Sequence, residues 1–185
     1  MTRIILASKS PRRKELLSLL DLPFEVIVSD IEEYIDYDND LVKEIEKLSY
    51  QKAKAVFDDN PDALVIGSDT IVKIGNVALG KPHTPEKAKE MLKMLSGHTH
   101  EVVTGVTILY GDRKETFSTV NKVTFYELSQ SDIDDYVATG EPLDKAGAYA
   151  IQGKGGKFIR SIDGDYYSIV GLPIGELHRR LKNYL

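Results

Sequence analysis

The sequence predicts an α/β fold, and three observations support this prediction. Residues 4–7 form a short apolar run typical of a buried strand, and residues 63–67 are continuously apolar, as in a central strand covered on both faces. Apolar residues recur at helical spacing over residues 41–57. The chain has 185 residues, of which 42% are hydrophobic, so we expect one domain over residues 1–185 with a core of useful size.

The first strand leads into a helix whose start is well marked. Ser10 is a suitable N-cap residue, and Pro11 suits the first helical position. Ser8, Arg12 and Arg13 add a hydroxyl and two cations to the positive end of this helix, which favours phosphate or another anion. An ordinary capped helix with solvated arginines explains the same residues equally well.

An acidic stretch precedes the second helix. A strand is expected at residues 24–28, and residues 30–40 are then rich in Asp and Glu. Most of these carboxylates are typical of a solvated loop, although one or two are candidate metal ligands. The helix follows over residues 41–57. Lys52 lies close to its apolar face, and therefore either extends to solvent or points into a site.

The apolar strand at residues 63–67 ends just before Asp69. Ligands of open α/β sheets bind beyond the carboxyl ends of strands, so this position favours a role for Asp69 in chemistry. A hairpin is expected over residues 70–79 because a Gly-Asn pair stands between two apolar runs. Lys81 follows the hairpin, and a surface lysine is its simplest interpretation when it is taken alone.

The rest of the chain adds further strands and helices and one unusual segment. Residues 144–171 are dense in glycine, with lysines, tyrosines and Gln152 interleaved, which favours a binding surface over a plain linker. The other expected elements are a helix that starts at residues 84–85 and ends just before Gly97, strands at residues 102–110 and 117–128, and helices at residues 129–138 and 172–181.

Composition and missing motifs exclude several classes of protein. The net charge of −5 argues against a general nucleic-acid binder. The absence of cysteine excludes disulfides, zinc–thiolate sites and thiol catalysis. No stretch approaches the ~20 apolar residues of a membrane span, and no signal peptide is visible. We therefore expect a cytoplasmic protein with neither a membrane nor a nucleic acid as partner.

Two further patterns resemble a nucleotide-binding loop and a zinc site but do not meet the requirements of either. Residues 75–81 match most of a P-loop, but Pro82 stands where the magnesium-binding Ser or Thr should be, and the segment is a hairpin. His98 and His100 form a His-x-His pair without a third ligand nearby, so we interpret them as strand-edge residues and not as a zinc site.

A coherent set of polar residues remains. Glu33 and Asp69 are candidate ligands of a divalent cation, and water activated by a metal or by a carboxylate base is a nucleophile for phosphorus. The basic side chains that would neutralise a polyphosphate are Arg12, Arg13, Lys52 and Lys81. Sequence spacing alone does not show that these residues meet in space.

Six sequence blocks, in this order, resemble the Maf family of nucleotide pyrophosphatases. They run nearly from end to end of the chain, and together they are far more specific than any one of them. The blocks are residues 6–13 (LASKSPRR), 67–70 (GSDT), 80–82 (GKP), 95–97 (LSG), 144–153 (DKAGAYAIQG) and 162–167 (IDGDYY).

This resemblance implies a fold and a reaction. The implied fold is a single Maf-like domain with a long central mixed sheet flanked by helices and two lobes around a substrate cleft, similar to inosine triphosphatase. The implied reaction splits a nucleoside triphosphate into the monophosphate and pyrophosphate. It requires a divalent cation, Mg²⁺ or Mn²⁺, and the resemblance also suggests a homodimer.

The resemblance further assigns roles to single residues. Asp69 matches the catalytic carboxylate and proton acceptor, and it shares the metal with Glu33, although Glu32 or both glutamates remain alternatives. Arg12, Thr70 and Gln152 match the positions of substrate choice, in the combination of the subgroup that acts on dTTP and UTP and, by extension, on modified pyrimidine nucleotides. The positions that line the phosphate and metal site match Ser8, Arg13, Glu33, Lys52 and Lys81.

A second class of function stays open beside the enzyme. The family is also linked to arrest of cell division and septum formation, which suggests a nucleotide-binding regulator whose hydrolysis is incidental. We favour the enzyme, because a set of base, metal ligands and cations is more than binding requires.

Overall fold

The computed structural model describes residues 2–185, and its chain divides into two compact units that are described here one at a time. The first unit contains the residues up to Asp69 together with Thr104–Thr119 and Gly171–Leu185. The second unit contains Thr70–Val103 and Val120–Val170. The single domain predicted over residues 1–185 stays a prediction.

The strands form the mixed sheet that was expected. Its seven strands follow the order β2-β1-β3-β5-β6-β7, and β4 pairs with β3. β1 is parallel to both β2 and β3, whereas the β3–β4 and β6–β7 pairs are antiparallel. The strands are β1 (Ile4–Ala7), β2 (Glu25–Val26), β3 (Leu64–Ile74), β4 (Val77–Leu79), β5 (Thr99–Tyr110), β6 (Arg113–Phe125) and β7 (Ile159–Asp163).

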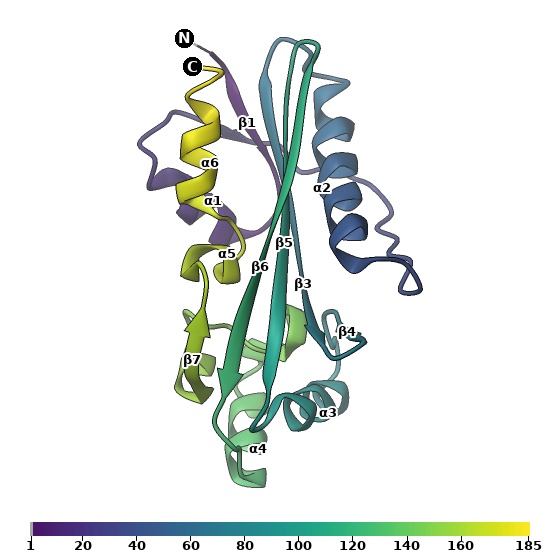
Figure 1. Ribbon diagram of the computed structural model, residues 1–185, viewed down its shortest axis with the longest axis vertical. Helices are drawn as coiled ribbons and strands as arrows, with labels where there is room; N and C mark the ends of the chain where they lie inside the picture. Colours follow the sequence, from purple (N-terminus) through teal and green to yellow (C-terminus); the bar gives the residue numbers. More distant parts are fainter. Residues whose placement is uncertain (1) are drawn as a thin grey trace. The chain divides into compact units, whose positions relative to one another are not determined.

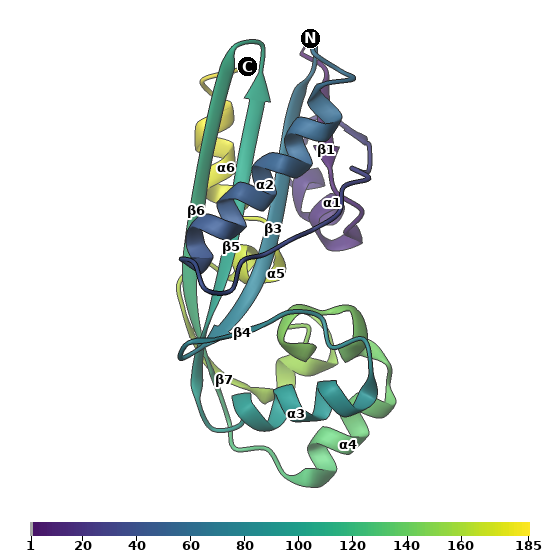
Figure 2. The same cartoon turned by 90° about the vertical axis from the view of Figure 1, so that its right-hand side faces the viewer.

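Helices cover both faces of the sheet within the first unit. Figures 1 and 2 agree that α1 (Pro11–Ser18) and α6 (Ile174–Leu181) lie on one face and α2 (Leu41–Phe57) on the other. The buried side of α2 includes Ala53 and Val56, which pack with residues of β1 and β3 in one apolar cluster. The amphipathic pattern of residues 41–57 therefore predicted this helix and its buried face correctly.

Two glycines allow α2 to lie directly against the sheet. A Cβ atom on Gly67 of β3 would stand 2.4 Å from the carbonyl oxygen of Ser49, and one on Gly105 of β5 would stand 2.8 Å from that of Ile45. No side chain fits at such distances, so only glycine permits this close approach. The helix carries Lys52 with it toward the edge of β3.

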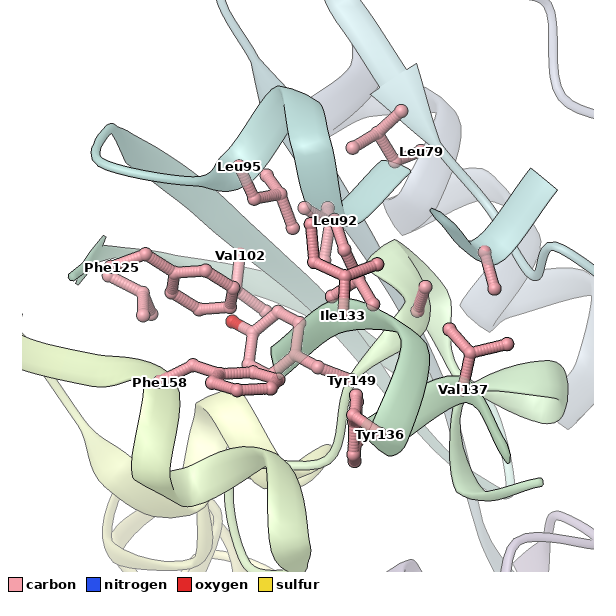
Figure 3. Packing of buried hydrophobic residues seen from close by; sticks show 14 of the residues in the cluster. Leu79, Leu92, Leu95, Val102, Phe125, Ile133, Tyr136, Val137, Tyr149 and Phe158 are labelled. Atoms are coloured by element: carbon pink, nitrogen blue, oxygen red, sulfur yellow. The ribbon is translucent and has the colours of Figure 1, made fainter. Parts of the chain in front are cut away.

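The second unit has a core rich in aromatic side chains. Phe125 and Tyr149 pack edge to face with ring centres 4.9 Å apart, and Tyr136 and Phe158 do so at 5.0 Å (Figure 3). Such arrangements favour aromatic pairs beyond the burial of their area. Around this centre lie α3 (Pro85–Leu95), α4 (Gln130–Ala138), α5 (Tyr166–Val170) and three 3₁₀ helices, η1 (Glu141–Asp144), η2 (Ala146–Ala148) and η3 (Lys154–Phe158).

Some details differ from the sequence-based expectations. The strand expected at residues 24–28 is reduced to Glu25–Val26, and the glycine-rich segment contains 3₁₀ helices, β7 and α5. His100 is a buried residue of β5, whose ring nitrogen Nε2 lies 2.7 Å from the Tyr149 hydroxyl, so its interpretation as a strand-edge residue was wrong. Across residues 2–185, no helix combines the length and the hydrophobicity needed to cross a membrane.

Candidate active site

The candidate site of the first unit lies where β1 ends. Ala7, the last residue of β1, pairs in parallel register with Gly67 of β3, so Ser8 and Ser68 follow at the same level. α1 leaves β1 on one face of the sheet, whereas α2 covers the other face (Figure 2). α1 follows β1 and α2 follows its parallel neighbour β2, so these two strands send their connections to opposite faces, and such a point is the usual ligand-binding position of an α/β sheet.

Arg13 is held at this point by side-chain and backbone groups. The Ser10 side chain caps α1 and accepts a hydrogen bond from the Arg13 backbone N–H. The guanidinium donates from Nε to the carbonyl oxygen of Gly171 at 2.8 Å, and its Nη1 lies 3.5 Å from the Ser8 hydroxyl. Ser68 donates a second hydrogen bond to the same Gly171 oxygen. Arg13 therefore has a fixed orientation and not that of a solvated surface arginine.

The charges around Arg13 act on its pKa in both directions. Burial lowers the pKa of the guanidinium below its ordinary value, Asp69 and Glu33 raise it, and Arg12 lowers it. Arginine remains protonated at physiological pH under such influences. The carboxylates of Asp69 and Glu33 and the guanidinium group of Arg12 therefore all act electrostatically on Arg13.

Lys52 connects two carboxylates. Its ammonium group donates to Asp69 Oδ1 at 2.6 Å and lies 2.9 Å from Glu33 Oε1. The side chains of Lys52 and Asp69 are only 10% and 13% exposed. Of the two orientations that the sequence left open for Lys52, the structure has the one that points into a site. A lysine at this depth needs such partners, because an unpaired buried charge is very costly.

The two glutamates that were alternatives for the metal face different surroundings. Glu33 reaches Lys52, whereas Glu32 lines a surface pocket of about 340 Å³ together with Tyr50, Lys54 and Asp58. Glu33 therefore stands with Asp69 around the Lys52 ammonium group. The choice of Glu33 over Glu32 as a metal ligand stays a prediction.

Glu33 and Asp69 provide only part of the oxygen ligands that a divalent cation requires. Within residues 2–185, no group of three or more His, Cys, Asp or Glu side chains gathers in a way that would hold a metal ion. Glu33 and Asp69 supply two carboxylates on one ammonium group. Mg²⁺ is commonly bound by one or two carboxylates plus the phosphate oxygens of a substrate, so these residues fit an ion that binds with a nucleotide.

The remaining predicted site residues are distributed over both units. Arg12 is half-buried on α1 in the first unit. Thr70 directly follows Asp69 in β3 and is the first residue of the second unit. Lys81 is exposed after β4, and Gln152 is exposed in the turn before η3. The first unit thus contains Ser8, Arg12, Arg13, Glu33, Lys52 and Asp69, whereas Thr70, Lys81 and Gln152 belong to the second unit.

Sequence reasoning missed the role of Gly171. Its φ of +138° is a conformation that favours glycine, and a Cβ atom there would stand 3.4 Å from Arg13 Nε. Its carbonyl oxygen orients Arg13 over a separation of 158 residues. The density of glycine in residues 144–171 was the available signal, but it did not indicate which glycine approaches which side chain.

A family model described as "Maf-like protein" matches residues 3–184. The chain belongs to the Maf family. A Bacillus velezensis protein named dTTP/UTP pyrophosphatase is 52% identical over 182 residues, which cover 98% of this chain and 96% of the relative. A Bacillus cereus protein of the same name is 53% identical over 184 residues, covering 100% of this chain and 96% of the relative. The family resemblance predicted from six sequence blocks is thereby confirmed.

The fold has a solved counterpart. The structure of the Staphylococcus aureus Ham1 protein superposes with a TM-score of 0.53 at 14% identity and covers 100% of both chains. At this identity the likeness concerns the fold alone. It agrees with the mixed sheet and flanking helices that the resemblance implied.

Proposed function

We propose that this Maf-family chain hydrolyses dTTP and UTP, and by extension modified pyrimidine nucleotides, to the monophosphate and pyrophosphate. The observation that carries the proposal is the position of Lys52, which contacts both Asp69 and Glu33 in the unit that also orients Arg13. The names of the full-length relatives support the choice of substrate.

The first unit supplies the groups that a polyphosphate needs. A nucleoside triphosphate carries about four negative charges, so it requires several cations and hydrogen-bond donors. Arg13, Ser8 and Lys52 serve this purpose in the first unit, and we assign Lys81 of the second unit to the same task. The buried hydroxyl of Ser8 stands at the N-terminus of α1, where the helix dipole also favours an anion.

Asp69 acts as the base. Water attacks the α-phosphorus, its proton passes to the Asp69 carboxylate, and the bond from the α-phosphorus to the bridging oxygen breaks so that pyrophosphate leaves. Lys52 holds this carboxylate in place through Oδ1 at 2.6 Å. Glu33 and Asp69 would hold Mg²⁺ or Mn²⁺, which when bound neutralises phosphate charge and polarises the phosphoryl group.

Three further residues account for substrate choice in this proposal. Arg12, Thr70 and Gln152 recognise the substrate, and the amide of Gln152 offers both donors and an acceptor to a pyrimidine edge. We also propose that the enzyme works in the cytoplasm as a homodimer, without a nucleic acid or a membrane as partner. Sedimentation of the pure protein measures the oligomeric state directly.

Hydrolysis in ¹⁸O-labelled water tests the proposal. The pure protein is incubated with each nucleoside triphosphate and Mg²⁺ or Mn²⁺, and the products are identified by mass spectrometry. We expect pyrophosphate and the monophosphate from dTTP and UTP, with the label in the monophosphate. Orthophosphate as product would indicate a different reaction, and tight binding without product would favour the regulator.

A further inference from the structure

Glu141, the first residue of η1, has a carboxylate that is surrounded by donors. Tyr136 of α4 donates its hydroxyl proton to Oε2 at 2.6 Å. The backbone N–H of Lys154 donates to Oε1 at 3.0 Å, and that of Gly155 donates to Oε2 at 3.1 Å. All four residues belong to the second unit. The carboxylate therefore ties the end of α4 to the start of η3.

Tyr136 extends this arrangement to the other side of the same turn. Its hydroxyl oxygen accepts a hydrogen bond from the backbone N–H of Ala150 at 3.1 Å. The turn itself closes through a hydrogen bond from the Gly153 N–H to the Ala150 carbonyl oxygen. Tyr136 and Glu141 thus hold the backbone both before and after Gln152. These two side chains together form the Tyr136–Glu141 bracket.

The bracket also lies close to the residue after Gln152. A Cβ atom on Gly153 would stand 2.2 Å from Glu141 Oε1, so a larger residue there would displace the carboxylate from its hydrogen bonds. Tyr136 is only 1% exposed, whereas the Gln152 side chain between the two anchored ends is exposed. The bracket therefore presents one amide side chain from a rigid backbone.

The ionisation of Glu141 agrees with these contacts. Burial alone would raise the pKa of its carboxyl group, but hydrogen bonds from Tyr136 and from two backbone N–H groups lower it below its ordinary value. The group is therefore an anion at neutral pH, and anionic acceptors make stronger hydrogen bonds than neutral ones. Stabilising an exposed surface turn does not by itself require a partly buried carboxylate with three donors.

We infer that Glu141 is a positioning residue for substrate selection, which acts by fixing the backbone around Gln152 through the Tyr136–Glu141 bracket. The inference rests on the proposed function, because Gln152 is assigned to substrate choice there. An amide discriminates between bases through the direction of its donors and acceptor, so its backbone must be held in place for the discrimination to be expressed. Glu141 itself touches no substrate in this assignment.

Glu141→Gln is the direct test. Glutamine keeps the size of the side chain. Its NH₂ group, however, must face at least one of the groups that donate a hydrogen bond to the carboxylate. Asp134→Asn is the matched control, because Asp134 also lies in the second unit and accepts hydrogen bonds from Gln130 and Lys89, away from the turn. Gln152→Ala gives the selectivity expected when the amide is absent.

Two measurements are made on each variant. The first is the ratio of dissociation constants for non-hydrolysable α,β-imido analogues of dTTP and GTP, together with kcat and KM for dTTP. The second is hydrogen exchange of the backbone amides of Ala150, Lys154 and Gly155. For Glu141→Gln we expect about tenfold lower selectivity, a raised KM with kcat within threefold, and at least tenfold faster exchange. Asp134→Asn should match the wild type in both.

The outcomes separate the inference from the proposed function. If Glu141→Gln shows faster hydrogen exchange but a selectivity within twofold of the wild type, the bracket has only a structural role. If its hydrogen exchange is unchanged, Glu141 does not fix the turn. Either result overturns the inference and leaves hydrolysis of dTTP untouched. A wild-type protein that binds dTTP selectively but releases no pyrophosphate rejects the proposed function, and the binding ratio then still tests Glu141. Should Glu141→Gln fail to fold, Tyr136→Phe provides the same test.

Discussion

The two units of the chain use their buried polar groups in different ways. In the first unit they include charges that meet one another, as Lys52 does with Asp69 and Glu33, beside neutral hydroxyls such as those of Ser49 and Thr107. In the second unit they are mostly neutral groups or a carboxylate that bind backbone amides or another side chain, as Glu141 does with Lys154 and Gly155. The core of this unit contains packed aromatic rings (Figure 3).

This difference suggests a division of tasks. Charges that meet in a partly buried place cost desolvation energy, and such clusters are typical of sites that handle charge during a reaction. Hydrogen bonds from a side chain to a backbone loop fix a shape instead. Substitutions in the charge cluster around Lys52 should therefore change the rate of the reaction, whereas those that disturb the Tyr136–Glu141 bracket should change selectivity.

The strongest test of this division is Asp69→Asn. The amide oxygen still accepts a hydrogen bond from Lys52, but the group no longer takes a proton, so we expect kcat to fall by about 10²–10⁴-fold. Asp62→Asn in the same unit is the control, because Asp62 is exposed and lies 3.8 Å from its partner Arg3. Pyrophosphate release from dTTP is the measurement. If Asp69→Asn turns over dTTP within threefold of the wild-type rate, Asp69 is not the base of the reaction.

The second test asks whether the charge cluster depends on the packing of α2. In Gly67→Ala the new methyl group overlaps the Ser49 carbonyl oxygen at 2.4 Å, so α2 must move and Lys52 with it. We expect a loss of about 3 kcal/mol in the free energy of unfolding and a lower kcat. Gly175→Ala is the control, since no atom lies within 4 Å of its Cβ position. Equal stability of the two variants in urea unfolding would contradict the close approach.

The third test concerns pH and His100, a buried residue of the second unit. Burial lowers the pKa of His100 to about 4 from its ordinary 6.5, so the folded state takes up this proton less readily than the unfolded chain. The folded state keeps its full stability above pH 6.5, where the ring is neutral in both states. It loses stability as the pH falls from 6.5 toward 4, because only the unfolded chain then gains the proton readily. At pH 5 the cost is about 2 kcal/mol.

Urea unfolding at pH 7 and pH 5 measures this cost. Between the two pH values, the free energy of unfolding of His100→Gln should fall by about 2 kcal/mol less than that of the wild type. In His98→Gln, whose residue is exposed, it should fall by as much as in the wild type. A wild-type pH dependence in His100→Gln would show that other groups cause the loss of stability in acid.

The smallest expected effect is on base selectivity. Gln152→Glu removes the amide donors, and we expect the preference for dTTP over GTP to fall by about tenfold with little change in kcat. Gln51→Glu, at an exposed position of the first unit, is the control. Relative rates that do not change across the nucleotides would assign recognition to other residues and sharpen the role of Arg12 and Thr70.

Much of the fold could be predicted from local sequence patterns. The N-cap at Ser10, the amphipathic run of α2 and the apolar run of β3 each depend on neighbouring residues, and each prediction was confirmed. β7 could not be predicted in the same way. Its residues are mostly exposed and show no regular alternation, and the strand exists because it pairs with β6, distant in the chain.

The candidate site divides along the same line. Asp69 was proposed as a site residue from its position after a buried strand, and the helix that carries Lys52 was predicted from its apolar pattern. The contact between them joins residues that are 17 positions apart on different elements, and it requires the missing side chain at Gly67. The bracket around Gln152 was not foreseen, because nothing near Glu141 in the sequence indicates that its partners lie at residues 154 and 155.

The carbonyl oxygen of Gly171 has a consequence for synthesis of the chain. Ribosomes release a protein from its N-terminus, so Arg13 emerges early, whereas the residue that orients it emerges close to the end of the sequence. The α1 helix can form without that residue, but the guanidinium acquires its orienting acceptor only when Gly171 folds back onto it. We therefore expect the Arg13 guanidinium to become ordered only after Gly171 has been synthesised.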